Sequence, residues 1–243
     1  MPLFRSTAFF LFQVLTVVPY GIACVLLAFM PLHWRYRFTA GWPRLAIWGA
    51  RTICGIRWQV VGAEHLPDGP AILLAKHQSA WETMFLFSHM PRDLCFVFKR
   101  ELLLIPFFGW GLGLLRMIHI DRSRGGNAFE SVVQQGSQCL AEGRWIIMFP
   151  EGTRIPVGRQ GKYKSGGARL AVRIGATVVP IAHNAGECWP RKAFLKKPGL
   201  VTVSIGPPID PQGLTAEDLN ARVEMWIEGE MRRLNPERYA VAA

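Results

Sequence analysis

The sequence predicts an α/β fold with a mixed central sheet and flanking helices, preceded by an N-terminal helical segment associated with a membrane. Two observations support this prediction. From residue 58 onward, short apolar runs alternate with amphipathic stretches and with turns that contain Gly or Pro. Before that point, residues 8–30 are apolar and uncharged. We therefore divide the chain of 243 residues into membrane-anchoring helices over 1–57 and a larger domain over 58–243.

The first apolar stretch runs from Ala8 to Met30, which is 23 residues without a charged side chain. About 20 apolar residues in a helix cross a hydrocarbon core of about 30 Å. Pro19 lies near the middle, where it can kink the helix or split it into two half-helices. A secretory signal peptide is disfavoured, because the run is too long and no Ala-x-Ala-like cleavage site follows it.

A second segment, residues 41–58, combines tryptophan with arginine. It contains Trp42, Trp48 and Trp58 together with Arg44 and Arg51, a composition that suits a helix lying among lipid headgroups. Three arrangements remain open at this stage. They are one membrane span followed by an interfacial helix, two interfacial or half-inserted helices, and an ordinary buried core helix.

The charges that flank the apolar stretch predict an orientation. Six Arg precede the first acidic residue, Glu64, and the sequence HWRYR follows the stretch directly at residues 33–37. Aromatic and basic residues of this kind flank membrane segments on the cytoplasmic side. We expect the protein at the cell (inner) membrane, with its larger domain on the cytoplasmic side.

The larger domain contains the predicted sheet. Strands are expected where short apolar runs occur, at residues 58–62, 71–76, 94–99, 114–120, 145–149, 176–183 and 200–206. Helices are expected at 127–142 and 166–174, where apolar residues recur at helical spacing. A last helix begins after Thr215, whose hydroxyl can cap it while Asp218 completes a capping box.

Charge and cysteine content limit the possible partners. The 28 Lys and Arg against 17 Asp and Glu give a net charge of +11, which favours an anionic lipid, a phosphorylated substrate or nucleic acid. Nucleic acid is not expected as a partner, since no recognised binding motif accompanies the charge. The five Cys form no close pair and no zinc-like cluster, so we expect a reducing compartment and no metal site.

Two motifs contain the candidate chemistry. His77 follows the strand at 71–76, and Glu82 stands five residues later, so that a turn leading into a helix would bring them together. A carboxylate on one ring nitrogen fixes the tautomer of a histidine and leaves the other nitrogen to act as a general base. Taken alone, this spacing is also compatible with a purely structural histidine. A serine hydrolase is disfavoured, because the sequence has no G-x-S-x-G elbow.

The second motif is FPEGTR at residues 149–154, directly after an expected strand. Gly152 permits close approach of the backbone to a ligand, and Arg154 offers a forked cation that suits a phosphate. Ten basic residues and one acidic residue lie between Arg154 and Lys197. Without the neighbouring motifs, such a region would also be compatible with a solvated basic surface.

The two motifs and their surroundings resemble the 1-acyl-glycerol-3-phosphate acyltransferase family. The His-x₄-Glu and FPEGTR blocks occur in family order with further similar stretches, which are KRELLLIP at 99–106, FG at 108–109, IDR at 120–122, KSGG at 164–167 and VVPI at 178–181. The similarity spans about residues 60–210. One departure is Glu82, because the commonest family form has Asp there.

The resemblance implies a glycerolphosphate acyltransferase-like fold and a specific reaction. An acyl chain passes from acyl-ACP or acyl-CoA to the sn-2 hydroxyl of lysophosphatidic acid, giving phosphatidic acid for phospholipid synthesis. The donor thioester is a substrate, and no bound cofactor is implied. Alternatives are another lysophospholipid, glycerol-3-phosphate or a lyso-aminolipid as acceptor, or a non-catalytic membrane tether that binds anionic lipid.

The resemblance also assigns roles to individual residues. His77 and Glu82 are the catalytic pair. The substrate phosphate is assigned to Lys99, Arg122, Gly152, Thr153 and Arg154, with Pro150, Glu151 and Pro180 as supporting residues of the motifs. Glu151 is expected to be structural and to pair with the backbone or with a nearby Arg.

Overall fold

The computed structural model describes residues 1–105, 108–121 and 127–239. Its helices are α1 (Pro2–Leu26), α2 (Leu32–Thr52), α3 (Trp81–His89), α4 (Phe108–Leu114), α5 (Asn127–Ala141), α6 (Gly166–Ile174), α7 (Ala185–Cys188) and α8 (Ala216–Leu234), with short 3₁₀ turns η1 (Ala63–His65) and η2 (Arg100–Leu104). Its strands are β1 (Ile56–Val61), β2 (Ala71–Ala75), β3 (Leu94–Lys99), β4 (Ile118–Ile120), β5 (Trp145–Met148), β6 (Thr177–His183) and β7 (Gly199–Ile205).

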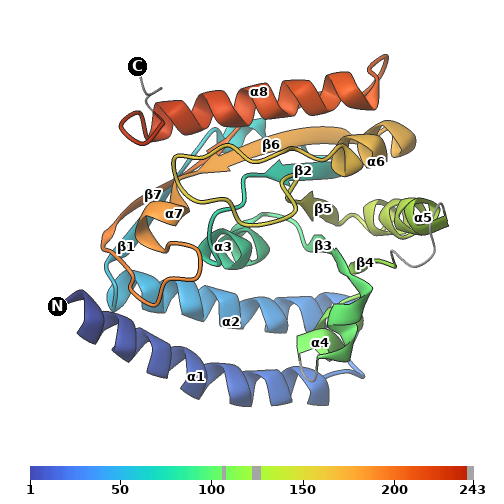
Figure 1. Cartoon of the computed structure of the whole chain (residues 1–243). Helices are drawn as coiled ribbons and strands as arrows, with labels where there is room; N and C mark the ends of the chain where they lie inside the picture. The colour runs from blue at the N-terminus through green and yellow to red at the C-terminus, as the bar shows by residue number, and fades with distance from the viewer. Residues whose placement is uncertain (106–107, 122–126, 240–243) are drawn as a thin grey trace.

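The strands form one mixed sheet in the order β1-β7-β6-β2-β5-β3-β4. The five strands from β6 to β4 are parallel to one another, whereas β7 is antiparallel to β6 and β1 is parallel to β7. The predicted α/β class with a mixed sheet is therefore confirmed. The parallel strands have helices on both faces, as expected for strands buried on two sides (Figure 1).

Alternate residues of β2 enter two separate cores. Ile72 and Leu74 pack in the cluster that includes α5, α6 and α8, whereas Ala71, Leu73 and Ala75 pack in the cluster that includes α2 and α3. All five side chains are fully buried. The side-chain period of two along a strand continues beyond β2, so the next two residues are directed to opposite faces of the sheet.

Three of the predicted elements differ from the structure by more than two residues at one end or both. The helix expected at 41–58 runs from Leu32 to Thr52, and Trp58 belongs to β1. The strand expected at 114–120 is limited to Ile118–Ile120, because Leu114 ends α4. The apolar stretch expected at 8–30 is helical from Pro2 to Leu26. In each case apolar composition indicated an element correctly, but it could not indicate where the chain turns.

Helices α1 and α2 form a hairpin against the domain. The ring of Tyr20 stacks on Phe38 at a centroid distance of 4.7 Å, and its hydroxyl donates to the Phe38 carbonyl at 2.7 Å. Nearer the N-terminus, Phe9 packs edge-on against Trp189 at 5.3 Å. Pro19 lies inside α1 without ending it. The division of the chain at residue 57 stays a prediction.

Thr215 caps α8 as expected. Its hydroxyl oxygen accepts the backbone N–H of Asp218 at 3.1 Å and donates to the Asp218 carboxylate at 2.6 Å. This side-chain cap fixes the start of the helix that covers one face of the sheet, with Asp218 bonded to the Thr215 hydroxyl in place of the backbone N–H of a capping box. Leu219, Val223 and Ile227 of α8 are fully buried.

Candidate active site

The candidate residues meet at one edge of the sheet. Strands β2, β3, β5 and β6 are parallel, so their carboxyl ends lie at the same edge. His77 follows β2 by two residues, FPEGTR follows β5 directly, and Lys99 and His183 are the last residues of β3 and β6. Ligands of open α/β sheets bind at this edge.

His77 and Glu82 form a hydrogen-bonded pair. The chain turns after β2, and α3 begins at Trp81, which returns Glu82 to His77. The Nδ1 atom of His77 lies 2.9 Å from Oε1 of Glu82. Glu82 is fully buried, whereas the His77 side chain is 16% exposed. With Nδ1–H donating to the carboxylate, Nε2 is the basic nitrogen of the ring.

Backbone donors hold the Glu82 carboxylate in place. Its Oε1 atom also accepts the N–H groups of Gln78 at 2.9 Å and Ser79 at 2.8 Å. Burial raises the pKa of this carboxyl, but the hydrogen bonds from His77 and from the Ser79 N–H help to outweigh it, so the pKa of Glu82 is lowered. Glu82 is therefore ionised at neutral pH and can stabilise an imidazolium.

The FPEGTR turn packs directly against His77. The Phe149 ring stacks on the imidazole at a centroid distance of 4.0 Å and an interplanar angle of 17°. The N–H of Ile155 donates to the His77 carbonyl at 2.8 Å. Gly152 has a φ of +65°, a left-handed backbone conformation that favours glycine at this position of the turn.

The backbone N–H of Gly152 is engaged inside the turn. Its N–H donates to the Phe149 carbonyl at 2.9 Å, so this donor is used within the turn. Pro150 supports this turn, whereas Pro180 bonds to the segment that follows β7. The Pro150 carbonyl accepts the N–H of Lys164 at 2.9 Å, and the Pro180 carbonyl, inside β6, accepts the N–H of Gly206 at 2.9 Å.

Glu151 pairs with the backbone, as expected, and its ionic partner is a lysine rather than an arginine. Its Oε2 accepts the N–H of His77 at 3.0 Å, and its Oε1 lies 2.6 Å from Nζ of Lys76. The same Nζ lies 2.7 Å from Oε1 of Glu228 on α8, which also accepts the Tyr163 hydroxyl at 2.8 Å. Burial opposes the charged ammonium, but the two carboxylates outweigh it and raise the pKa of Lys76.

The sequence interpretation did not identify Lys76, Tyr163 or Glu228. Lys76 lies next to His77, which could have drawn attention to it, but a lysine at the end of a strand is usually exposed. Here it is fully buried. Its side chain follows the face of Ile72 and Leu74, which leads to α8.

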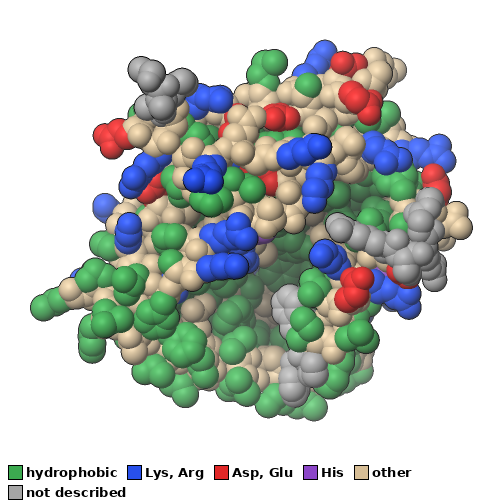
Figure 2. Space-filling model, viewed as in Figure 1, with side chains coloured by type: hydrophobic (Ala, Val, Ile, Leu, Met, Phe, Trp, Pro, Cys, Tyr) green, Lys and Arg blue, Asp and Glu red, His purple; other side chains and the backbone are tan. Residues whose placement is uncertain are grey.

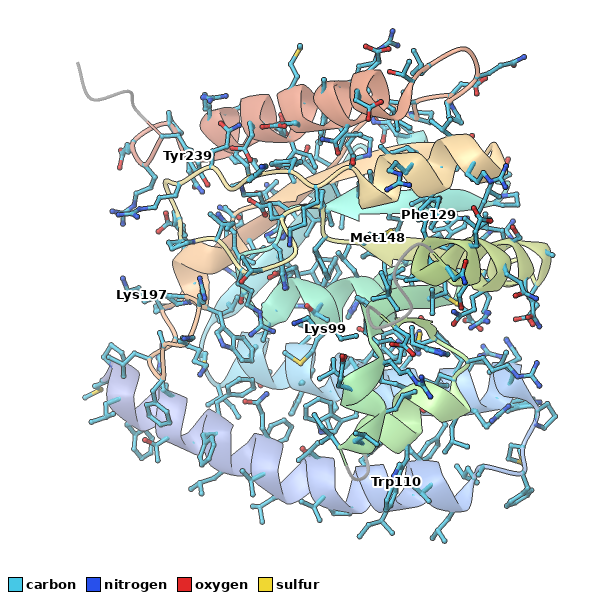
Figure 3. All side chains as sticks on the ribbon, turned by 45° about the vertical axis from the view of Figure 1, so that its right-hand side comes forward. Lys99, Trp110, Phe129, Met148, Lys197 and Tyr239 are labelled. Carbon is cyan, nitrogen blue, oxygen red and sulfur yellow. The ribbon has the colours of Figure 1, made fainter. Side chains whose placement is uncertain are left out.

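The structure describes four of the five predicted phosphate ligands. Arg154 is half-buried, and its Nε is buried without a hydrogen-bond partner among the described residues. Lys99 and Thr153 are exposed, and Arg122 lies outside the described residues. Figure 2 shows a hollow on this face, with Lys and Arg along its rim and hydrophobic side chains below it. Figure 3 shows Lys99 below Met148, the last residue of β5.

No group of three or more His, Cys, Asp or Glu side chains that could hold a metal ion occurs in the described part of the chain. The cysteines are free, and four of the five are buried. At the sheet edge, His77 offers a general base, and Arg154 and Lys99 offer cations.

Together, the mixed sheet, the His–Glu pair and the FPEGTR turn at its edge are those of an acyltransferase domain. The family model described as Acyltransferase matches residues 57–184. A 1-acyl-sn-glycerol-3-phosphate acyltransferase from Pseudomonas aeruginosa is 44% identical over 237 residues, which cover 96% of this chain and 92% of the relative. The chain belongs to the 1-acyl-sn-glycerol-3-phosphate acyltransferase family and is an enzyme.

More distant relatives agree. A mouse 1-acyl-sn-glycerol-3-phosphate acyltransferase alpha is 31% identical over 73% of this chain and 64% of its own length. The crystal structure of the 1-acyl-sn-glycerophosphate (LPA) acyltransferase PlsC from Thermotoga maritima has the same fold, with a TM-score of 0.78 at 24% identity, covering 96% of this chain and 95% of the other.

Proposed function

We propose that this enzyme transfers an acyl chain from acyl-ACP or acyl-CoA to the sn-2 hydroxyl of lysophosphatidic acid, forming phosphatidic acid. The observation on which this proposal rests is the His77–Glu82 hydrogen bond of 2.9 Å, with the imidazole stacked against the FPEGTR turn. A poised base beside a turn with cationic neighbours suits an acceptor that carries both a hydroxyl and a phosphate.

The reaction needs one base and no covalent enzyme intermediate. Nε2 of His77 removes the hydroxyl proton while the oxygen attacks the thioester carbonyl carbon. The resulting tetrahedral intermediate collapses, the C–S bond breaks, and the imidazolium returns its proton to the leaving thiolate. Glu82 stabilises the imidazolium between these two steps, and general-base assistance of this kind contributes about 10²–10⁴ in rate.

Arg154 is the phosphate ligand best supported by its surroundings. Its buried Nε has no acceptor among the described residues, and a buried donor without an acceptor is unfavourable. A phosphate oxygen would supply that acceptor. Lys99, at the end of β3, adds a second cation at the same edge of the sheet.

The membrane location follows from helix α1, which is long and apolar enough to cross a bilayer. Only 6% of its most apolar 18-residue window is buried. However, α1 packs along α2, which contains Arg35, Arg37, Arg44 and Arg51 and is itself packed on α3. We therefore place α1 in one leaflet beside α2, rather than across the bilayer.

Three half-exposed tryptophans support this placement. Trp34 and Trp48 of α2 are each 55% exposed, and Trp110 of α4 is 48% exposed. Helix α4 contacts α1, and Figure 3 shows Trp110 beside it. Tryptophan favours the layer between lipid tails and water. The six Arg that precede Glu64 favour the cytoplasmic face of the inner membrane.

The test is an acyl-transfer assay in lipid vesicles with lysophosphatidic acid and both thioester donors. We expect phosphatidic acid as product, and a loss of about 10²–10⁴ in turnover for His77→Ala. Near-normal turnover of that variant would exclude His77 as the base. Glycerol-3-phosphate and other lysolipids in parallel identify the acceptor. Lipid binding without transfer from either donor would instead favour the tether.

A further inference from the structure

The peptide group between Lys76 and His77 is held at both ends by side chains from other elements. Its carbonyl lies 2.8 Å from Nε2 of His183, the last residue of β6. Its N–H donates to Oε2 of Glu151 at 3.0 Å. The backbone is fixed on either side as well, because Lys76 N–H donates to the Ile181 carbonyl at 2.9 Å and the His77 carbonyl accepts from Ile155.

His183 is suited to act as a fixed hydrogen-bond donor rather than as an acid or a base. Its ring is fully buried, and Nδ1 accepts the backbone N–H of Ala185 at 3.3 Å. The proton is therefore on Nε2, where it is donated to the Lys76 carbonyl. Burial lowers the pKa of His183 against the opposing influence of Glu82, so the ring is neutral.

Glu151 is held just as firmly on the other side of the peptide group. Its second oxygen lies 2.6 Å from Nζ of Lys76, which is fixed in turn by Glu228 on α8. Glu151 is 3% exposed. The orientation of its carboxylate is thus determined by an ion pair on one oxygen and by the His77 N–H on the other.

We propose that His183 and Glu151 are positioning residues that clamp the Lys76–His77 peptide group and so set the distance between His77 and the acceptor hydroxyl. Glu82 fixes the rotation of the imidazole, but the position of the ring also depends on the backbone that bears it. A general base must lie about 2.6–3.2 Å from the group it deprotonates. A displacement of about 1 Å can reduce turnover about 10²-fold.

This inference rests on the proposed function, and a pair of His183 variants tests it. In His183→Gln, the amide N–H₂ occupies the place of Nε2–H and can still donate to Lys76. In His183→Asn, the shorter amide replaces Nδ1 and leaves the Lys76 carbonyl without its donor. We expect kcat of His183→Asn to fall about 10–10²-fold with unchanged KM for both substrates, and His183→Gln to recover most of that loss.

A matched control removes a similar bond elsewhere. Nδ1 of His65 lies 2.8 Å from the Ile205 carbonyl, at the opposite edge of the sheet. Because His65 bonds through Nδ1, the variant that removes this bond is His65→Gln, whose amide lies at the place of Nε2. We expect His65→Gln to keep the wild-type kcat. The inference is overturned if His183→Asn keeps wild-type kcat, if His183→Gln loses as much as His183→Asn, or if the loss is in KM.

Two further measurements make the result decisive. If His183→Asn does not fold, Glu151→Gln tests the other end of the clamp, because one amide cannot accept from both Lys76 and the His77 N–H. We expect it to lower kcat alone, and wild-type kcat would overturn the inference. Full activity of His77→Ala would refute the proposed function, whereas inactive His77→Ala with fully active His183→Asn would refute only the clamp.

Discussion

At the residue scale, the candidate site combines short-range and long-range contacts. His77 and Glu82 are five residues apart, and one turn followed by one helix brings them together, so their pairing could be predicted from the sequence. Lys76 and Glu228 are 152 residues apart. No local sequence pattern predicts such a contact, because the contact depends on where α8 crosses the sheet. The backbone bond of Glu151 was expected, but its second partner, Lys76, was missed for the same reason.

The buried Lys76 predicts a large effect on stability. Lys76→Met leaves Glu151 and Glu228 as buried carboxylates without their shared cation. Breaking a buried ion pair from one side costs about 3–5 kcal/mol. We expect a decrease of that size in the free energy of unfolding, measured by urea denaturation monitored by circular dichroism.

The double variant Lys76→Met with Glu228→Gln provides the control. It removes one of the two unpaired charges, so it should unfold at a higher urea concentration than Lys76→Met alone. A single variant as stable as the wild type would show that the lysine is not buried against both carboxylates.

At the scale of elements, the existence of most strands and helices was predictable, but several boundaries were not. The apolar run at 8–30 predicted a helix, yet its packing against α2 and Trp189 could not be inferred from composition. Trp58 fitted both the amphipathic segment at 41–58 and the strand expected at 58–62, and β1 takes it because Ile56–Val61 pairs in register with Gly199–Ser204. Strand pairing over such a distance along the chain overrides local periodicity.

The exposed apolar side chains of α1 predict a membrane contact that can be weakened without changing the stability of the fold. Val14 and Val18 lie four residues apart and are 44% and 58% exposed. Changing both to Asn removes apolar surface without adding charge, and burying each valine contributes about 1.5–3 kcal/mol. We expect vesicle binding to weaken at least about 10-fold, measured by co-sedimentation, with an unchanged Tm.

The matched control for α1 is Met225→Asn on α8. Met225 is 75% exposed, and helix α8, which contains it, lies on the opposite side of the molecule from α1 (Figure 1). We expect it to bind vesicles as the wild type does. Equal binding by the α1 double variant would mean that this helix does not enter the lipid.

At the scale of the whole molecule, the fold places two kinds of surface near one another. The hairpin of α1 and α2 offers exposed apolar side chains, and the carboxyl edge of the sheet is lined with Lys and Arg (Figure 2). A lysolipid has the matching parts, since its acyl chain belongs in the bilayer and its phosphate requires cations.

The net charge of +11 predicts how the protein responds to salt. Raising the ionic strength from about 0.1 M to about 1 M shortens the Debye length from about 10 Å to about 3 Å. Attraction of basic residues to anionic lipid, about 1 kcal/mol for each residue near the surface, is screened, whereas burial of the apolar face of α1 is not. Binding to phosphatidylglycerol vesicles should therefore weaken with salt, while weaker binding to phosphatidylcholine vesicles should persist. The variant with Asn at positions 14 and 18 should lose the salt-resistant apolar binding and retain the salt-sensitive binding to anionic lipid. If binding to both vesicle types did not depend on salt, the basic rim would bind the substrate and not the membrane, because the attraction of a charge to the membrane surface must be screened by salt.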